Sequence, residues 1–443
     1  MPTRRAVLGR LAAPAAWPLL APVALAASPV LASAGVQRAL AALADRSEPG
    51  RSPEEIAADE SYWFPIQQAF TPDRSLINLN FGGVSAAPLV VQDAMKRHLD
   101  LSNTAPAWAM WRVLEPRRET VRGQLAGLFG CSADEIAITR NASESLQILQ
   151  CGFDLAPGDE LLTSDQDYPR MLATWRQRQR REKVVLRTFP LPVPAEDPAE
   201  IVRRFEAQIT PRTRLILVSH MINLTGQILP VRDLVALGRK RGIPVLVDGA
   251  HTFAHLPFTV TDLGCEYFAT SLHKWLFAPH GTGFLYVRRE RIRGLWPLTA
   301  ADESLDGDIR KFEEIGTHPA ANALAISEAV TFHLGVGPER KAARLRYLRD
   351  TWARRLMRND RVRLLTSLRP ESSCGIGTFG VEGVAPDRLA SHLWDRHRIL
   401  TTAIQHADVQ GVRVTPGLST TLEEVERFCE AVEGVIRAGL PAA

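Results

Sequence analysis

The chain is poor in cysteine, and its few cysteines follow no recognisable pattern. There are five in 443 residues, an odd number, scattered and without the paired spacing of a zinc site. Most lie in apolar surroundings, which indicates buried free thiols; one disulfide, formed in an oxidising compartment, is the alternative. This absence excludes a cysteine-based zinc site, and we expect no metal site. The cysteines are Cys131, Cys151, Cys265, Cys374 and Cys429.

A strong net charge is also missing. The formal charge at pH 7 is +4, and three of the positive charges, Arg4, Arg5 and Arg10, belong to an N-terminal leader, so that removing the leader leaves 4 − 3 = +1. Proteins that bind nucleic acids neutralise backbone phosphates with many lysines and arginines. We therefore expect no nucleic-acid partner.

The chain has no apolar run long enough for a stable membrane span. Its one candidate, the alanine-rich stretch that follows Arg10 and ends near Ala26, is too short and is broken by prolines. Twin arginines, an apolar stretch and a small-residue cleavage site match a twin-arginine export signal. We expect residues 1–26 to be a signal peptide read by the twin-arginine machinery and the mature protein to be periplasmic or secreted. A basic leader without an export role is the alternative.

What the chain does contain is a core-forming composition and alternating strands and helices. It is 45% hydrophobic and has no low-complexity tract, so it can bury a substantial core. The alternation is typical of an α/β fold with a mostly parallel sheet flanked by helices. We predict a linker and N-terminal arm at 27–60, a large domain at 61–337 and a smaller C-terminal α+β domain at 338–443. The predicted strands are 160–163, 184–186, 214–218, 245–247, 268–270, 283–287, 377–381 and 412–415, and the predicted helices are 88–101, 115–129, 144–151, 231–241, 339–357, 386–396 and 421–438.

Two neighbouring strand ends carry the most informative residues. The apolar run 243–247 predicts a buried parallel strand, so Asp248 lies at a C-terminal strand end, where open α/β sheets bind ligands. Lys274 follows the next strand on a tight turn. Pyridoxal phosphate enzymes need an amine that holds the cofactor's aldehyde as a Schiff base and a carboxylate that keeps its ring nitrogen protonated. Lys274 and Asp248 can fill these roles; a surface lysine and a helix-capping aspartate are the alternatives.

Five separated segments together resemble the class V aminotransferases of fold type I. This family also contains cysteine desulfurases and isopenicillin N epimerase, and the pattern looks closest to the epimerase branch. The resemblance runs from about residue 76 to 435 and implies a fold type I transferase fold, pyridoxal 5'-phosphate as cofactor, and a homodimer with shared active sites. The segments are 78–84, 139–146, 219–227, 248–283 and 411–414.

The resemblance implies that the cofactor's phosphate is held from three places. One is a helix N-terminus, whose backbone amides attract anions. The second is the segment just before Lys274, and the third is a turn that would reach the phosphate of the neighbouring subunit. An ordinary helix cap and a core histidine are the alternatives for the first two. In that order the residues are Asn141, Ala142 and Ser143; Ser271 and His273; and Gly281 and Thr282.

Further roles are implied for the cofactor ring and the substrate. Tyr168 would stack on the ring, as suits an aromatic side chain beside a cation, and a core tyrosine is the alternative. Asn223 would donate to the phenolic oxygen, and Gln227 and His251 would lie in the site with less defined roles. Arg413 resembles the clamp for the substrate α-carboxylate, which suits a planar bidentate donor.

One departure from the family narrows the reaction. Cysteine desulfurases need a nucleophilic thiol on the loop ahead of the arginine clamp, and that loop, 401–408, has no cysteine, while Cys374 lies much earlier. We therefore predict a pyridoxal phosphate-dependent aminotransferase or amino-acid epimerase that acts on a small amino acid or amine. In an epimerase Tyr168 or His251 would be the second acid. A desulfurase or C–S lyase, and an inactive exported binding or scaffold protein, are the alternatives.

Overall fold

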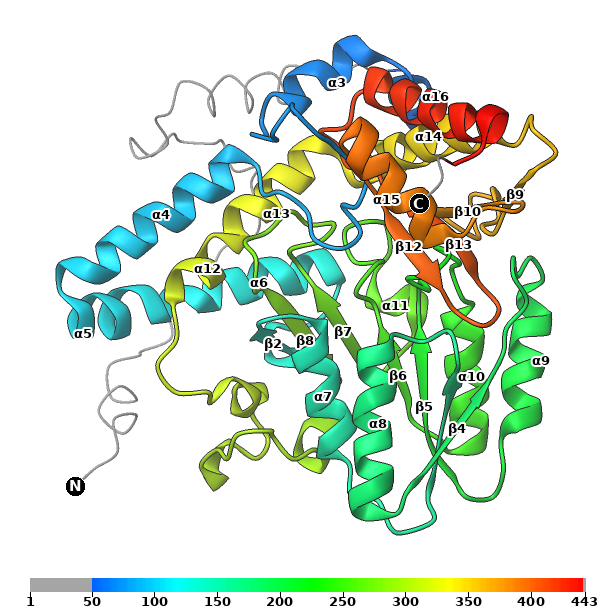
Figure 1. The fold of residues 1–443 in the computed structure, drawn as a ribbon. Helices are drawn as coiled ribbons and strands as arrows, with labels where there is room; N and C mark the ends of the chain where they lie inside the picture. Colours follow the sequence, from blue (N-terminus) through cyan, green and yellow to red (C-terminus); the bar gives the residue numbers. More distant parts are fainter. Residues whose placement is uncertain (1–49, 441–443) are drawn as a thin grey trace.

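The structure is a computed structural model that describes residues 50–440 (Figure 1). The predicted signal peptide and residues 27–49 of the predicted linker lie outside the described residues. The described part begins with two short helices, α2 (Pro53–Ala57) and α3 (Glu60–Gln67), capped by Ser52 and Asp59. Within residues 50–440, no helix combines the length and apolar character needed to cross a membrane.

A seven-stranded sheet forms the centre of the molecule, in the order β2-β8-β7-β6-β5-β3-β4. Only β8 runs antiparallel to its neighbours. Side chains alternate between the two faces of a strand: Ile216 and Val218 of β5 enter one core, while Leu215 and Leu217 enter the core on the other face. Its strands are β2 (Ile136–Thr139), β3 (Glu160–Ser164), β4 (Val185–Phe189), β5 (Thr213–Ser219), β6 (Val245–Asp248), β7 (Tyr267–Ser271) and β8 (Gly283–Val287).

Helices cover both faces of this sheet, as Figure 1 shows for α7 and α8 in front of it. The apolar residues of α7 and α8 share one core with the sheet, and those of α6, α9, α10 and α13 share the other. A sheet buried on both faces explains the nearly continuous apolar runs of β5 to β8. The helices are α4 (Leu89–Thr104), α5 (Pro106–Trp108), α6 (Arg118–Phe129), α7 (Ala142–Gly152), α8 (Pro169–Glu182), α9 (Pro198–Gln208), α10 (Val231–Arg241), α11 (Val260–Leu263), α12 (Ala320–Leu324) and α13 (Ile326–Val336).

The C-terminal part has its own antiparallel sheet, in the order β12-β13-β10-β9, and its own core around Trp352, Phe379 and Phe428. An early strand, β1 (Ile77–Asn78), pairs with β11 (Ile399–Leu400) and joins this core. The other elements are α14 (Pro338–Leu356), β9 (Val362–Leu364), β10 (Gly377–Val381), α15 (Pro386–His397), β12 (Thr402–Gln405), β13 (Gln410–Val414) and α16 (Leu422–Ala438). The predicted domain boundaries stay predictions.

The loop after β5 fastens the C-terminal part to the large sheet. Three consecutive backbone carbonyls of this loop accept hydrogen bonds from side chains of the C-terminal part. At the next position, Gly226 (φ +75°) lies so close to this part that an added Cβ would be 2.5 Å from the carbonyl oxygen of Ile376, so no larger residue fits. The donors to Asn223, Leu224 and Thr225 are, in order, Arg413 Nη1 at 2.9 Å, Thr378 Oγ1 at 2.6 Å and Thr366 Oγ1 at 2.6 Å.

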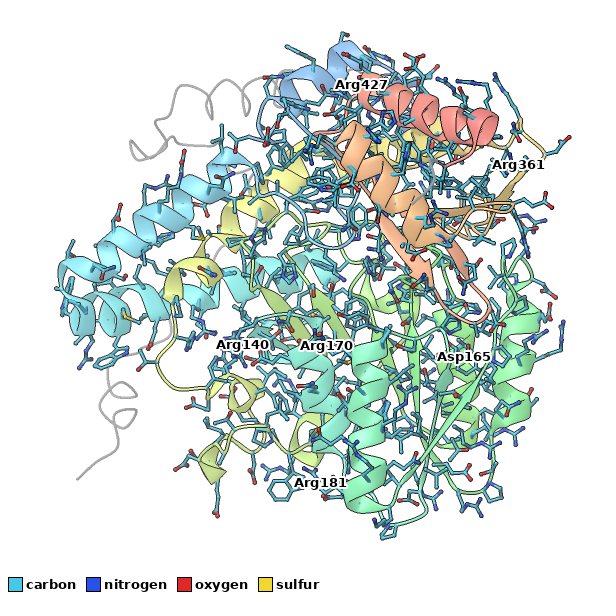
Figure 2. All side chains as sticks on the ribbon, viewed as in Figure 1. Arg140, Asp165, Arg170, Arg181, Arg361 and Arg427 are labelled. Atoms are coloured by element: carbon cyan, nitrogen blue, oxygen red, sulfur yellow. The ribbon has the colours of Figure 1, made fainter. Side chains whose placement is uncertain are left out.

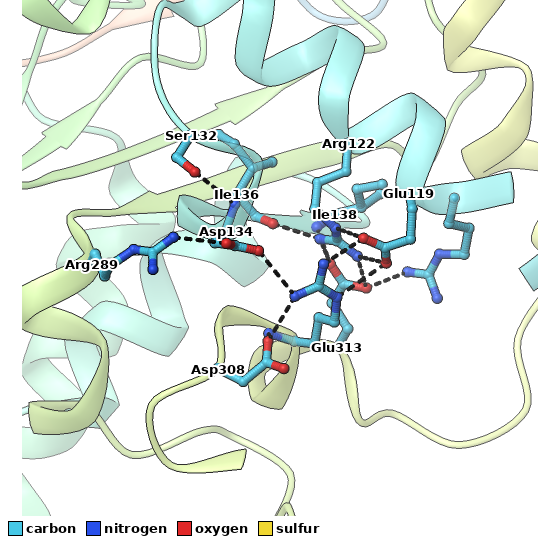
Figure 3. A network of polar contacts seen from close by, with 11 residues as sticks. Glu119, Arg122, Ser132, Asp134, Ile136, Ile138, Arg289, Asp308 and Glu313 are labelled. Atoms are coloured by element: carbon cyan, nitrogen blue, oxygen red, sulfur yellow. Dashed lines mark hydrogen bonds and ion pairs between the residues drawn. The ribbon is translucent and has the colours of Figure 1, made fainter. Parts of the chain in front are cut away.

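A buried network of ion pairs ties residues 309–313 to the edge of the large sheet (Figure 3). Glu313 accepts from Arg122 Nη1 at 2.5 Å, from Arg118 Nη2 at 2.9 Å and from the backbone N–H of Ile138 at 2.6 Å. The side chains of Arg122 and Glu313 are only 1% and 7% exposed. Here opposite charges compensate each other inside the protein.

The predicted α/β architecture is confirmed, and so are the predicted strands and helices, within a few residues at their ends. Elements that the sequence patterns did not predict include the strands β1, β2, β9, β11 and β12 and the helices α8, α9, α12 and α13. All five cysteines are free thiols, and residues 50–440 contain no cluster of side chains suited to a metal ion. Charged side chains such as Arg181 on α8 and Arg427 on α16 lie on the outside of the fold (Figure 2).

Candidate active site

The predicted carboxylate and lysine lie at neighbouring strand ends, above the C-terminal edge of the sheet. Asp248 is the last residue of β6, where it pairs in register with Ser219 of β5, and Lys274 follows β7 by three residues. A cavity of about 180 Å³ opens at this edge. It is lined by Gly83, Asn141, Ala142, Ser143, Leu146, Tyr168, Ser219, Met221, Asn223, Asp248, Ala250, His251, Ser271, His273 and Lys274.

The amine of Lys274 lies 3.2 Å from Nε2 of His251. Burial lowers the pKa of Lys274 to about 8; nearby Asp248 opposes this shift and Arg413 adds to it. A lysine with this pKa has a sizeable neutral fraction near neutral pH, and only the neutral amine is a nucleophile or a base.

Two carboxyl groups are buried beneath the cavity. Burial raises the pKa of Asp248, and the N–H of Ala250, which donates to Oδ1 at 2.9 Å, partly opposes this. Asp167, 2% exposed, accepts from Thr163 Oγ1, Ser219 Oγ and the N–H of Tyr168, yet burial and the neighbouring Asp248 raise its pKa to about 6. Neither carboxylate forms an ion pair within residues 50–440. A cationic ring beside Asp248 would supply the missing positive charge.

The N-terminus of α7 forms one end of the cavity. Asn141 caps this helix by accepting the N–H of Glu144 at 2.9 Å, and the N–H of Ala142 donates to Ser271 Oγ at 2.9 Å. Ser143 lines the cavity in the first turn of the helix. The partial positive charge of a helix N-terminus favours an anion such as a phosphate at this end.

His273 and the turn before β8 lie next to each other. His273 Nδ1 is 3.1 Å from the carbonyl oxygen of Thr282, so Nδ1 is the donor, and burial lowers the pKa of this ring to about 4. The single proton of the neutral ring is therefore on Nδ1, where it is used in the bond to Thr282. Nε2 carries no proton that could be donated to a phosphate. Gly281 has a positive φ of +76°, and the buried hydroxyl of Thr282 donates to the carbonyl of Pro279. Gly281 and Thr282 do not line the cavity, and their predicted role toward a second subunit stays a prediction.

The residues predicted for the cofactor ring are only partly brought together. Tyr168, at the start of α8, and Asn223 both line the cavity, and Oδ1 of Asn223 is buried without a hydrogen-bond partner among the described residues. Gln227 instead turns away: its Oε1 accepts the N–H of Ala195 and its Nε2 donates to the carbonyl of Ile228. The expectation that Gln227 lies in the site is therefore wrong, because its amide pairs with backbone groups.

Arg413 lies beside the cavity, behind Asn223. Its Nη1 donates to the carbonyl of Asn223 and its Nη2 donates to Oδ1 of Asn80 at 3.0 Å, while Nε has no partner among the described residues. No carboxylate within residues 50–440 pairs with it, and burial lowers its pKa to about 10. A buried guanidinium without a counter-charge suits a ligand carboxylate.

Sequence reasoning missed Asp167 and several residues of the cavity wall, among them Gly83, Ser219 and Met221. Asp167 precedes the predicted Tyr168, and Ser219 and Met221 lie in a segment that carried the resemblance. Their adjacency in sequence to predicted site residues was the available signal.

The arrangement fits pyridoxal phosphate by the chemistry of its donors. A carboxylate, an amine and a helix N-terminus surround one cavity, and they match the ring nitrogen, the aldehyde and the phosphate of this cofactor. The unpaired Oδ1 of Asn223 shows that polar groups of the wall are still unsatisfied in the protein alone.

Comparison with known proteins agrees with the interpretation of the cavity as a pyridoxal phosphate site. The family model described as Aminotransferase class-V matches residues 77–428. Isopenicillin N epimerase of Streptomyces clavuligerus is 32% identical over 391 residues, which cover 84% of this chain and 98% of the relative. A probable cysteine desulfurase of Pseudomonas aeruginosa is 28% identical over 397 residues, 84% of this chain and 96% of the relative. A solved mutant of C-DES, with glycine covalently linked to its pyridoxal phosphate cofactor, has a TM-score of 0.71 and 24% identity, covering 81% of this chain and 98% of that one.

Proposed function

The chain belongs to the class V aminotransferase family, with pyridoxal phosphate as its cofactor, and from this premise we propose that it is an amino-acid epimerase. The observation that carries the proposal is the pairing of a buried amine of lowered pKa, Lys274, with a buried guanidinium that lacks a counter-charge, Arg413. One group can move a proton and the other can bind a carboxylate. The similarity to isopenicillin N epimerase over nearly the whole of that protein supports this choice.

Each residue has a separate task in the proposed reaction. Arg413 binds the α-carboxylate of the substrate and so fixes the α-carbon near Lys274. Bound pyridoxal phosphate supplies an electron sink for negative charge at that carbon. Lys274 Nζ removes the α-proton, and Asp248 keeps a proton on the ring nitrogen. Epimerisation then needs an acid that returns a proton from the opposite face, and Tyr168, which lines the cavity, is our candidate.

A cysteine desulfurase fits less well. The loop 401–408, which now forms β12 and the turn to β13, carries no cysteine. Cys374 is completely buried, its Sγ lies 3.5 Å from the carbonyl of Ala342, and it does not line the cavity. Burial also raises the pKa of this thiol, which disfavours the nucleophilic thiolate.

We also propose that the protein is exported by the twin-arginine route and works as a homodimer. The first proposal is supported by Arg4, Arg5 and the apolar stretch after them. The second is supported by the large apolar side chains of Leu99 and Trp108, which are exposed on the projection formed by α4 and α5 (Figure 1). In such a dimer the turn at the exposed Gly281, next to the buried Thr282, would approach the partner's cofactor phosphate.

Our first prediction tests Lys274 directly. Purified mature protein should absorb visible light with bound cofactor, and borohydride should attach the cofactor's mass to the peptide that contains Lys274. Lys274→Ala should abolish this attachment and lower turnover by at least about a thousandfold, because no other group takes its place. Lys240→Ala, an exposed lysine on α10, is the matched control.

A panel of L- and D-amino acids in heavy water then separates the reactions. Deuterium uptake at the α-carbon with formation of the other enantiomer, and without a keto acid, supports the epimerase. Strict dependence on a keto acid would indicate an aminotransferase, and release of sulfide from cysteine would indicate a desulfurase. If the wild-type protein attaches no cofactor, the favoured alternative becomes an inactive binding or scaffold protein.

A further inference from the structure

Behind Lys274 lies a second layer of aromatic and basic side chains that the proposed reaction does not use. The indole N–H of Trp275 donates to Nδ1 of His251 at 3.4 Å, while Nε2 of His251 faces Lys274 Nζ at 3.2 Å. Each ring nitrogen of His251 therefore has one defined neighbour. We propose that Trp275 is a positioning residue that holds His251 as the neutral tautomer protonated at Nε2, and that this tautomer keeps Lys274 in its neutral, reactive form.

The tautomer follows from the chemistry of indole. Trp275 can only donate, so Nδ1 of His251 must offer its lone pair. A proton on Nδ1 would bring two N–H groups face to face, which disfavours both the other neutral tautomer and the imidazolium. The single proton of the neutral ring is then on Nε2 and points at Lys274. An N–H faces an amine favourably only if the amine is neutral and accepts.

The surroundings keep Trp275 in place. Its ring stacks on His255 with centroids 3.6 Å apart and an interplanar angle of 14°. His255 is fixed in turn, since its Nε2 accepts the N–H of Gly375 at 2.9 Å and its Nδ1 donates to the carbonyl of His251 at 2.7 Å. The buried amine of Lys341 donates to the carbonyl oxygen of Trp275. Both the ring and the backbone of Trp275 are thus anchored by the groups around them.

Charges near the pair act in both directions. Asp248 on β6 favours a charged Lys274, whereas Arg413 on β13 disfavours it. Burial lowers the pKa of His251 well below its usual value, and Lys274, Arg413 and His255 act in the same direction. The neutral state of His251 agrees with the tautomer that the hydrogen bonds define.

The proposal rests on the proposed function in one respect, that Lys274 is the amine to which the cofactor attaches. It goes beyond that function because it assigns the reactivity of this amine to an indole that touches neither cofactor nor substrate. It also predicts a property of the protein without cofactor, the position of one proton.

The second prediction concerns Trp275→Phe, which retains an aromatic ring to stack on His255 but removes the N–H. With the Nδ1 position free, His251 can take the other tautomer and accept from a charged Lys274, so the pKa of Lys274 rises. We expect cofactor-free full chain, mixed with pyridoxal phosphate, to attach it about tenfold more slowly at pH 7, and the pH of half-maximal rate to move upward. Stopped-flow absorbance measures both.

The matched control is Trp352→Phe. Trp352 is also completely buried, but its indole N–H has no partner among the described residues. The proposal would be overturned if the pH dependence of the rate of cofactor attachment were the same in Trp275→Phe as in wild type and Trp352→Phe. A shift in Trp275→Phe alone would support it.

A second measurement decides the matter even if Trp275→Phe does not fold. In wild-type protein labelled with 15N-histidine, the signals that disappear in His251→Gln report the tautomer of His251. Protonation at Nε2 supports the proposal, and protonation at Nδ1 overturns it. This result does not depend on catalysis: failure of wild type to attach the cofactor would overturn the proposed function, while the position of the proton would still test the role of Trp275.

Discussion

The molecule contains two buried polar regions that treat charge in opposite ways. In the network of Figure 3, Glu313 lies between Arg118 and Arg122, so that each buried charge has an opposite charge within about 3 Å. In the candidate active site, no ion pair within residues 50–440 joins Lys274 or Arg413 to a carboxylate, and Asp248 and Lys274 influence each other's pKa without forming one. Compensation characterises the first region and its absence characterises the second.

The pKa values record this difference. In the network, burial opposes the charge of Arg122, but Glu313 and Glu119 together outweigh burial and raise the pKa of Arg122. In the site, burial wins, and the pKa values of Lys274 and Arg413 fall while that of Asp248 rises. Strongly shifted groups that gather in one cavity are typical of functional sites. The lesson is that the partner of a buried charge, more than burial itself, distinguishes a structural network from a reactive site.

The largest effect should come from breaking the compensated region. Glu313→Gln removes the buried counter-charge that Arg118 and Arg122 share and leaves Arg122 only the half-exposed Glu119 at 3.1 Å, so we expect a loss of about 3–5 kcal/mol in the free energy of unfolding. Urea denaturation measures it. Glu314→Gln, its exposed neighbour, is the control and should change little. A loss as small as that of the control would mean that the network does not stabilise the fold.

A slightly smaller, pH-dependent effect should come from the uncompensated region. Burial and the neighbouring Asp248 raise the pKa of Asp167 from the ordinary 3.8 of an aspartate to about 6 in the folded protein. The folded state therefore binds more protons between these pH values, and the stability of the cofactor-free protein falls as pH rises from about 4 to 6. Over this pH range, the free energy of unfolding of the wild type should fall by on the order of 3 kcal/mol relative to that of Asp167→Asn.

Thermal unfolding of wild type and variant across pH 4 to 7 tests this sign. The exposed Asp387→Asn serves as control. Parallel pH curves for wild type and Asp167→Asn would contradict the comparison, because they would show that this buried carboxyl is compensated after all.

The smallest effect should come from an ion pair at the surface. Arg204 and Glu200 form an i,i+4 pair at 2.7 Å on α9, but their side chains are 42% and 39% exposed. Water and salt screen such a pair, so Arg204→Ala should change the free energy of unfolding by less than about 0.5 kcal/mol. A loss above about 1 kcal/mol in urea denaturation would show that burial is not the deciding factor.

The sequence predicted the parts of the fold and site that local patterns determine. Asp248 could be placed because an apolar run ends at it. Strand β2 was missed because it has only four residues and pairs with β8, far away in the chain. Asp167 was missed because its environment depends on Thr163 and on Ser219, which lies 52 residues away.

The wrong or missing predictions within the site also come from contacts that the local sequence does not determine. Gln227 lies in a segment that resembles the family, but its amide turns to the backbone of Ala195, a contact that no local pattern encodes. The neighbour of His251 is likewise set by tertiary packing: Trp275 follows Lys274 directly, yet only the turn after β7 brings its indole to Nδ1 of His251. The sequence identifies candidate side chains, whereas packing decides their hydrogen-bond partners.

The three backbone carbonyls after β5 that accept hydrogen bonds from the C-terminal part have a consequence for the position of Arg413. Arg413, Thr378 and Thr366 hold Asn223, Leu224 and Thr225 at once, so the C-terminal part cannot swing outward without breaking three hydrogen bonds together. These bonds hold the strand that carries Arg413 against the loop that carries Asn223, which lines the cavity. Under the proposed function, Arg413 would then be set in place before a substrate binds, and the distance from its guanidinium to Lys274 would limit the length of the substrates that fit.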